Sequence, residues 1–104
     1  MKNIAELKKL SQNFTLLYVE DDTAISKIML NYFLIIFKDV YFAKNSEDAL
    51  EIYKDKRCDL IITDIVLPKM SGLEFSAHIK KINSDQSIII MSAYSDPDKF
   101  SESI

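Results

Sequence analysis

The residues of this chain best suited to chemistry are acidic ones that follow apolar runs. The run Glu20–Asp22 comes directly after Phe14–Val19, and Asp64 comes directly after Leu60–Thr63. A short apolar run is typical of a strand that a parallel sheet buries on both faces. Carboxylates brought together bind a hard divalent cation through oxygen, and one of them can then act as a nucleophile toward phosphorus.

The elements that must position these acids alternate along the chain. Apolar runs rich in β-formers predict strands at Phe14–Val19, Val40–Ala43, Leu60–Thr63 and Ser87–Met91. Helical spacing and capping residues predict helices at Ile4–Leu10, Thr23–Phe37, Ser46–Lys56 and Ser71–Ile82, and another that begins at Asp96. This alternation favours an α/β fold, in which parallel strands are joined by right-handed crossovers and helices cover both faces of the sheet.

Two apolar segments are expected to be core. One is the stripe along Thr23–Phe37, and the other is the run Ile88–Ile90. Helix N-caps are expected at Asp22, Ser46 and Ser71.

The predicted topology gathers several polar side chains at one edge of the sheet. Parallel strands all end at the same edge, so four acids, Glu20, Asp21, Asp22 and Asp64, should meet there, with the Ser92 hydroxyl after the fourth strand. Two charges about 4 Å apart repel by roughly 4 kcal/mol at an effective dielectric constant near 20. A fold tolerates such a cluster if one acid stays protonated or a cation lies among them, and Mg²⁺ suits the oxygen ligands.

The loop after Asp64 carries two residues with special backbone properties. Pro68 prevents a helix from starting at once, because it restricts the residue before it and lacks an amide hydrogen. Gly72 follows, just after Ser71. Asp64 should therefore stay at the carboxyl end of an inner strand, the edge at which open α/β sheets bind ligands.

Composition narrows the class of protein further. The 104 residues suffice for one domain, and the net charge of −3 argues against nucleic-acid binding by this segment. A single cysteine, Cys58, fits a reducing compartment. No stretch reads as a membrane span or a signal peptide, so we expect a cytoplasmic protein without membrane partners.

Three short motifs, each at the end of a predicted strand, resemble those of a known family. They are Val19–Asp22, the Asp64–Gly72 loop with its Pro68, and Met91–Ala93. Together and in this order they are similar to the receiver domain of two-component response regulators. The resemblance runs from about Phe14 to Ile104.

The resemblance implies a flavodoxin-like, doubly wound sheet and a signalling role. Asp64 would accept a phosphoryl group from a histidine kinase, so the domain would be a phosphoacceptor rather than an enzyme. Mg²⁺ would be held by Glu20, Asp21, Asp64 and the backbone carbonyl of Val66. Ser92 would hydrogen-bond a phosphoryl oxygen and switch a partner-binding face near the fourth strand and the helix after it.

The chain departs from the family at its carboxyl end. Receiver domains have a fifth strand that ends in a lysine and a fifth helix, and neither is in this sequence. We therefore expect a strand order of 2-1-3-4, with residues 1–13 an amphipathic extension and 14–104 an incomplete receiver domain. Truncation of a longer regulator with an unknown effector is our first explanation, and a homodimer through the exposed edge of the fourth strand is our second.

Two other functions remain open. A receiver-like module could bind partners without being phosphorylated, as the missing lysine suggests. A Mg²⁺-dependent phosphatase of the haloacid-dehalogenase type is the third hypothesis. It fits less well, because those enzymes place an Asp-x-Asp motif after the first strand and Glu20 stands at its first position.

Overall fold

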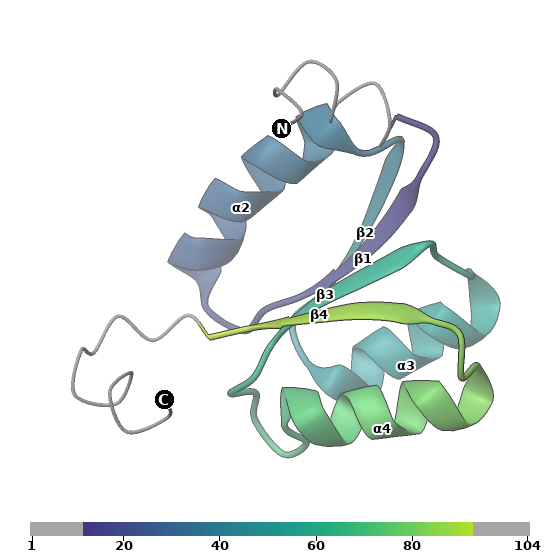
Figure 1. The fold of residues 1–104 in the computed structure, drawn as a ribbon. Helices are drawn as coiled ribbons and strands as arrows, with labels where there is room; N and C mark the ends of the chain where they lie inside the picture. The colour runs from purple at the N-terminus through teal and green to yellow at the C-terminus, as the bar shows by residue number, and fades with distance from the viewer. Residues whose placement is uncertain (1–11, 93–104) are drawn as a thin grey trace.

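The computed structural model describes residues 12–92, in which strands and helices alternate strictly (Figure 1). The strands are β1 (Thr15–Val19), β2 (Asp39–Ala43), β3 (Leu60–Asp64) and β4 (Ser87–Met91). The helices are α2 (Thr23–Ile36), α3 (Ser46–Asp55) and α4 (Gly72–Ile82). The helices predicted at Ile4–Leu10 and from Asp96 lie outside the described residues.

The four strands form one parallel sheet in the order β2-β1-β3-β4. On central β1, Leu17 pairs with Tyr41 of β2 and with Ile61 of β3. Helix α2 lies on one face of the sheet, and α3 and α4 lie on the other (Figure 1). The predicted flavodoxin-like, doubly wound fold with the strand order 2-1-3-4 is therefore confirmed.

Two apolar layers hold the helices on the sheet. Leu17 and Val19 of β1 belong to the layer under α3 and α4, whereas Leu16 and Tyr18 belong to the layer under α2. This division follows from the alternation of side chains along a strand. The ring of Tyr18 meets the ring of Phe33 on α2 edge to face, with the centroids 5.0 Å apart.

Two segments predicted to be core are only partly buried. On α2, Phe33 is 8% exposed, but Ile28 and Tyr32 of the same stripe are 59% and 61% exposed. On β4, Ile89 and Ile90 are 48% and 36% exposed, so the prediction that Ile88–Ile90 is core is wrong for these two. The physical reason is the place of these residues in the fold. β4 is an edge strand within the described sheet, and α2 covers only part of the sheet face on which it lies.

Polar caps start each helix, and one of them differs from the prediction. Asp22 caps α2 and Ser71 caps α4, as expected. Helix α3 is capped by Asn45, whose side-chain oxygen accepts a hydrogen bond of 2.8 Å from the amide of Asp48. The predicted cap, Ser46, is instead the first helical residue, because the extended backbone that a cap requires falls one position earlier.

Candidate functional site

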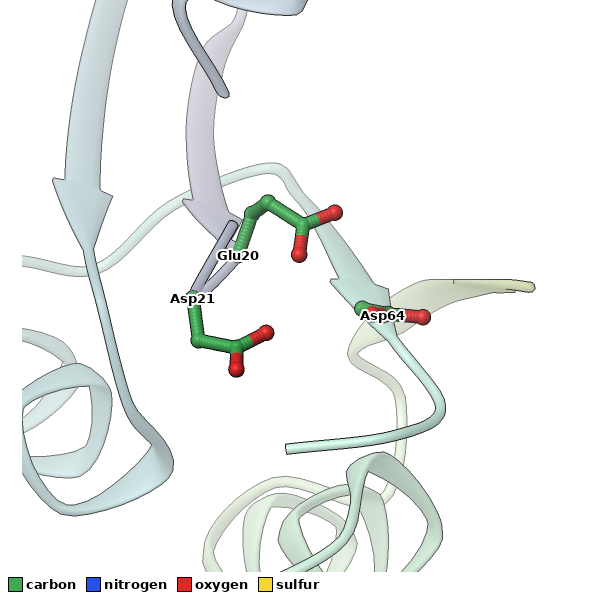
Figure 2. Close-up of side chains that lie close together, drawn as sticks. All are labelled: Glu20, Asp21 and Asp64. Atoms are coloured by element: carbon green, nitrogen blue, oxygen red, sulfur yellow. The ribbon is translucent and has the colours of Figure 1, made fainter. Parts of the chain in front are cut away.

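Three carboxyl groups meet at the carboxyl edge of the sheet. One oxygen each from Glu20, Asp21 and Asp64 can be chosen so that all three lie within 4.8 Å of one another. Figure 2 shows Glu20 and Asp21 side by side after β1, with Asp64 across from them at the end of β3. The adjacency of β1 and β3 in the sheet brings these acids together, as the sequence predicted.

The cluster is buried on one side and open on the other. Glu20 and Asp64 are only 3% and 7% exposed, whereas Asp21 is exposed. The Glu20 amide donates to the carbonyl of Ala43 at the end of β2 (3.1 Å). The Glu20 carboxylate accepts from the amide of Asp22 (3.2 Å), so backbone groups on both sides fix this residue.

Burial changes the acid–base behaviour of the site. It raises the pKa of Glu20 to about 7, against the lowering effect of the Asp22 amide and with further raising by the charges of Asp64 and Asp21. Burial and the nearby charges of Glu20 and Asp64 also raise the pKa of the Tyr18 hydroxyl. Near neutral pH, a proton and any cation that binds there therefore compete for the Glu20 carboxylate.

The donor set fits a hard divalent cation. The three clustered groups all offer carboxylate oxygens, which Mg²⁺ prefers to nitrogen or sulfur, and a few of them suffice because Mg²⁺ retains waters. Asp22 is not part of the set, because its carboxylate accepts the capping hydrogen bond from the amide of Ile25 (2.9 Å). The expectation that Asp22 serves as a cap is thus confirmed.

The loop after Asp64 is held close to the site by its backbone. The Ile65 amide donates to the carbonyl of Met91 (2.8 Å), and the Gly72 amide donates to the carbonyl of Ile65 (2.9 Å). A Cβ atom at Gly72 would lie 2.2 Å from the carbonyl oxygen of Asp64, which is far too close. Glycine at this position therefore lets α4 start directly against the backbone of Asp64.

The two remaining predicted residues lie at the same edge. Met91 pairs with Asp64 in the ladder of β3 and β4, and exposed Ser92 follows it. Val66 is two residues beyond Asp64 and its side chain is 54% exposed. The roles given to the Ser92 hydroxyl and the Val66 carbonyl stay predictions.

An apolar-walled cleft beside the acids was not predicted. It has a volume of about 220 Å³ and is lined by Tyr18, Glu20, Ile25, Met29, Asp64 and Met91. A signal existed in the sequence, because Glu20 follows β1 directly and lies two residues after Tyr18, so that the alternation of side chains puts both on one side of the sheet. The cleft gives the acidic site an apolar neighbour on the α2 side of the sheet.

Comparison with known proteins identifies the family. Residues 16–104 match the family described as the response regulator receiver domain. The chain belongs to this family. Receiver domains interact with histidine kinases and effector domains, and this one has their fold and their cluster of acids at the edge of the sheet.

Several relatives illustrate the range of the family. The chain is 32% identical over 91 residues to sporulation initiation phosphotransferase F of Bacillus subtilis, covering 88% of this chain and 73% of that protein. It is 33% identical over 85 residues to the probable transcriptional regulator ycf27 of Porphyridium aerugineum, covering 82% of this chain. The N-terminal domain of an uncharacterized protein from Wolinella succinogenes has a similar structure, with a TM-score of 0.71, 31% identity, and 86% of this chain and 72% of that one covered.

The match to the transcriptional regulator is limited to part of that protein. The receiver domain spans 35% of the length of the Porphyridium regulator.

Within residues 12–92, none of the helices has the length and apolar character that crossing a bilayer requires.

Proposed function

We propose that this receiver domain accepts a phosphoryl group on Asp64 from the phosphohistidine of a sensor kinase. The observation that supports this most strongly is the triad of carboxyl groups, Glu20, Asp21 and Asp64, within 4.8 Å at the carboxyl edge of a parallel sheet. Mg²⁺ would be held by these three groups and the Val66 carbonyl. When bound, it would neutralise the negative charge that otherwise repels an incoming phosphoryl group.

The transfer exchanges one bond to phosphorus for another. A carboxylate oxygen of Asp64 forms a bond to phosphorus while the phosphorus–nitrogen bond of the phosphohistidine breaks. The imidazole takes the electron pair of that bond and leaves as neutral histidine when a proton is available to it. β3 and the hydrogen bond from the Ile65 amide to the Met91 carbonyl fix the backbone on both sides of Asp64, which would hold its carboxylate for in-line approach.

The phosphoryl group would then change a binding surface. The Ser92 hydroxyl would donate a hydrogen bond to a phosphoryl oxygen, which would draw the end of β4 toward Asp64. The surface around β4 and the residues that follow it would bind the effector differently in the two states. The module would work in the cytoplasm as a phosphoacceptor, with its output set by an effector that we leave unassigned.

Intact-mass spectrometry after incubation with Mg²⁺ and acetyl phosphate tests this proposal. The expected result is one phosphoryl adduct that needs Mg²⁺, is lost at alkaline pH as an acyl phosphate should be, and is absent from Asp64→Asn. The matched control is Asp22→Asn, which removes a charge beside the site but keeps a capping side chain. This control should still form the adduct.

Other outcomes would assign another function. Absence of an adduct on the wild-type protein would contradict the proposal and favour a module that binds partners without phosphorylation. Continuous hydrolysis of a phosphate ester, without a trapped adduct, would point to a phosphatase of the haloacid-dehalogenase type. An adduct that persists in Asp64→Asn would place the acceptor elsewhere.

A further inference from the structure

One buried hydroxyl joins the phosphoacceptor loop to a helix far away in the sequence. Ser46, in the first turn of α3, is 1% exposed. Its Oγ donates a hydrogen bond of 2.8 Å to the carbonyl of Met70, 24 residues later. Because Asn45 takes the capping role, the Ser46 hydroxyl is available for this long-range contact.

The loop that receives this bond carries the proposed metal and phosphoryl chemistry. It runs from Asp64 to Gly72. Its other described ties to neighbouring elements are a backbone hydrogen bond to β4, the buried side chain of Leu67, and the partly buried side chain of Met70, which packs against the core under α3 and α4. The ion pair between Lys69 and Glu47 adds little, because both side chains are largely exposed and 3.9 Å apart. Ser46 therefore adds a part-buried polar contact to the apolar packing of Met70, and the two together fix the second half of the loop.

We propose that Ser46 is a positioning residue for the phosphoacceptor loop. Its hydrogen bond would hold the loop in the arrangement in which the Val66 carbonyl and the Asp64 carboxylate face the same cation. Without the hydroxyl, the Met70 carbonyl loses its buried partner and the loop populates other arrangements. The apparent affinity for the cation then falls in proportion to the population of the competent arrangement. This inference rests on the proposed function of the acidic site.

The test compares Ser46→Ala with Asn45→Ala in the whole chain. Both substitutions act on the first turn of α3, but Asn45 makes no described bond to the loop. Calorimetric titration with Mg²⁺ should give a dissociation constant about two- to tenfold higher for Ser46→Ala, which is the range that one neutral hydrogen bond is worth. Asn45→Ala should bind Mg²⁺ like the wild type, although it destabilises α3.

A second readout needs no metal. In the metal-free protein, the amides of Met70 and Gly72 should exchange with deuterium at least about twofold faster in Ser46→Ala than in Asn45→Ala. If Ser46→Ala fails to fold, Ser46→Cys replaces it, since a thiol of similar size keeps a weak donor at this position. The cysteine variant should then bind Mg²⁺ more weakly than the wild type.

The outcomes separate this inference from the proposed function. Equal Mg²⁺ affinities and equal loop exchange in the two alanine variants would overturn the positioning role while leaving phosphorylation intact. A wild-type protein that neither binds Mg²⁺ nor forms an adduct would overturn the proposed function first. Unequal loop exchange together with unequal Mg²⁺ affinity supports both.

Discussion

The pKa of Glu20 makes the stability of the metal-free domain depend on pH in an unusual direction. Most carboxylates in proteins are stabilised in their charged form, so stability falls in acid. Glu20 is the opposite case, because burial raises its pKa from 4.5 to about 7. The folded state therefore holds this proton up to higher pH than the unfolded state does.

The sign and the size of the effect follow from proton linkage. Between the two pKa values the folded state binds more protons than the unfolded state, so the free energy of unfolding falls as pH rises. The Glu20 contribution is complete below about pH 4.5 and is lost as pH passes through about 7. At about 1.4 kcal/mol per pKa unit, the loss amounts to roughly 3 kcal/mol.

Urea denaturation at a series of pH values, with a chelator present, measures this loss. Glu20→Gln is the matched variant, because its amide mimics the protonated acid at every pH. The variant and the wild type should be equally stable near pH 4, and the variant should be more stable by up to about 3 kcal/mol near pH 8. Saturating Mg²⁺ should reduce this difference by stabilising the wild type. A difference that stays constant from pH 4 to pH 8 would refute the reasoning.

Three further substitutions have specific expected outcomes. Gly72→Ala should destabilise the domain by about 1–3 kcal/mol and weaken Mg²⁺ binding, because the new Cβ pushes against the Asp64 carbonyl. Urea denaturation measures the first effect and calorimetric titration with Mg²⁺ the second. Asp22→Ala should cost about 1 kcal/mol in urea denaturation, whereas Asp22→Asn should cost little, because only alanine removes the cap. Tyr53→Phe should lower the free energy of unfolding by about 1–3 kcal/mol without changing the Mg²⁺ affinity. The lost hydrogen bond to Gln86 (2.8 Å) is buried and lies at the amino end of the strands, away from the acids; the same two assays test this.

The sequence predicted the features that depend on local pattern. The apolar runs of β1 and β3 indicate inner strands, and the rule that parallel strands end at one edge predicts that Glu20 and Asp64 lie together, as they do. The caps at Asp22 and Ser71 followed from residue type and spacing. The caps succeed because they depend on a few neighbouring residues, and the inner strands succeed because continuous apolar runs mark strands that are covered on both faces.

The features that the sequence missed depend on contacts between distant residues. Apolar spacing on α2 could not show that Ile28 and Tyr32 lie on a flank that the described sheet does not cover. Both Asn45 and Ser46 are good capping residues by type, and nothing in the sequence indicated that the Ser46 hydroxyl bonds to a loop 24 residues away. The need for Gly72 was visible as a residue type, but its cause, a close approach to another backbone, is a tertiary fact.

The central claim is that the acids at the ends of β1 and β3 share one divalent ion. Mn²⁺ prefers the same oxygen ligands as Mg²⁺, and its unpaired electrons broaden nuclear resonances near it. Titration of the ¹⁵N-labelled domain with substoichiometric Mn²⁺ should first broaden the amides of residues 20–22 and 64–66 together, and excess Mg²⁺ should restore them. Broadening confined to one of these two segments, or spread over other acidic surfaces, would contradict the account.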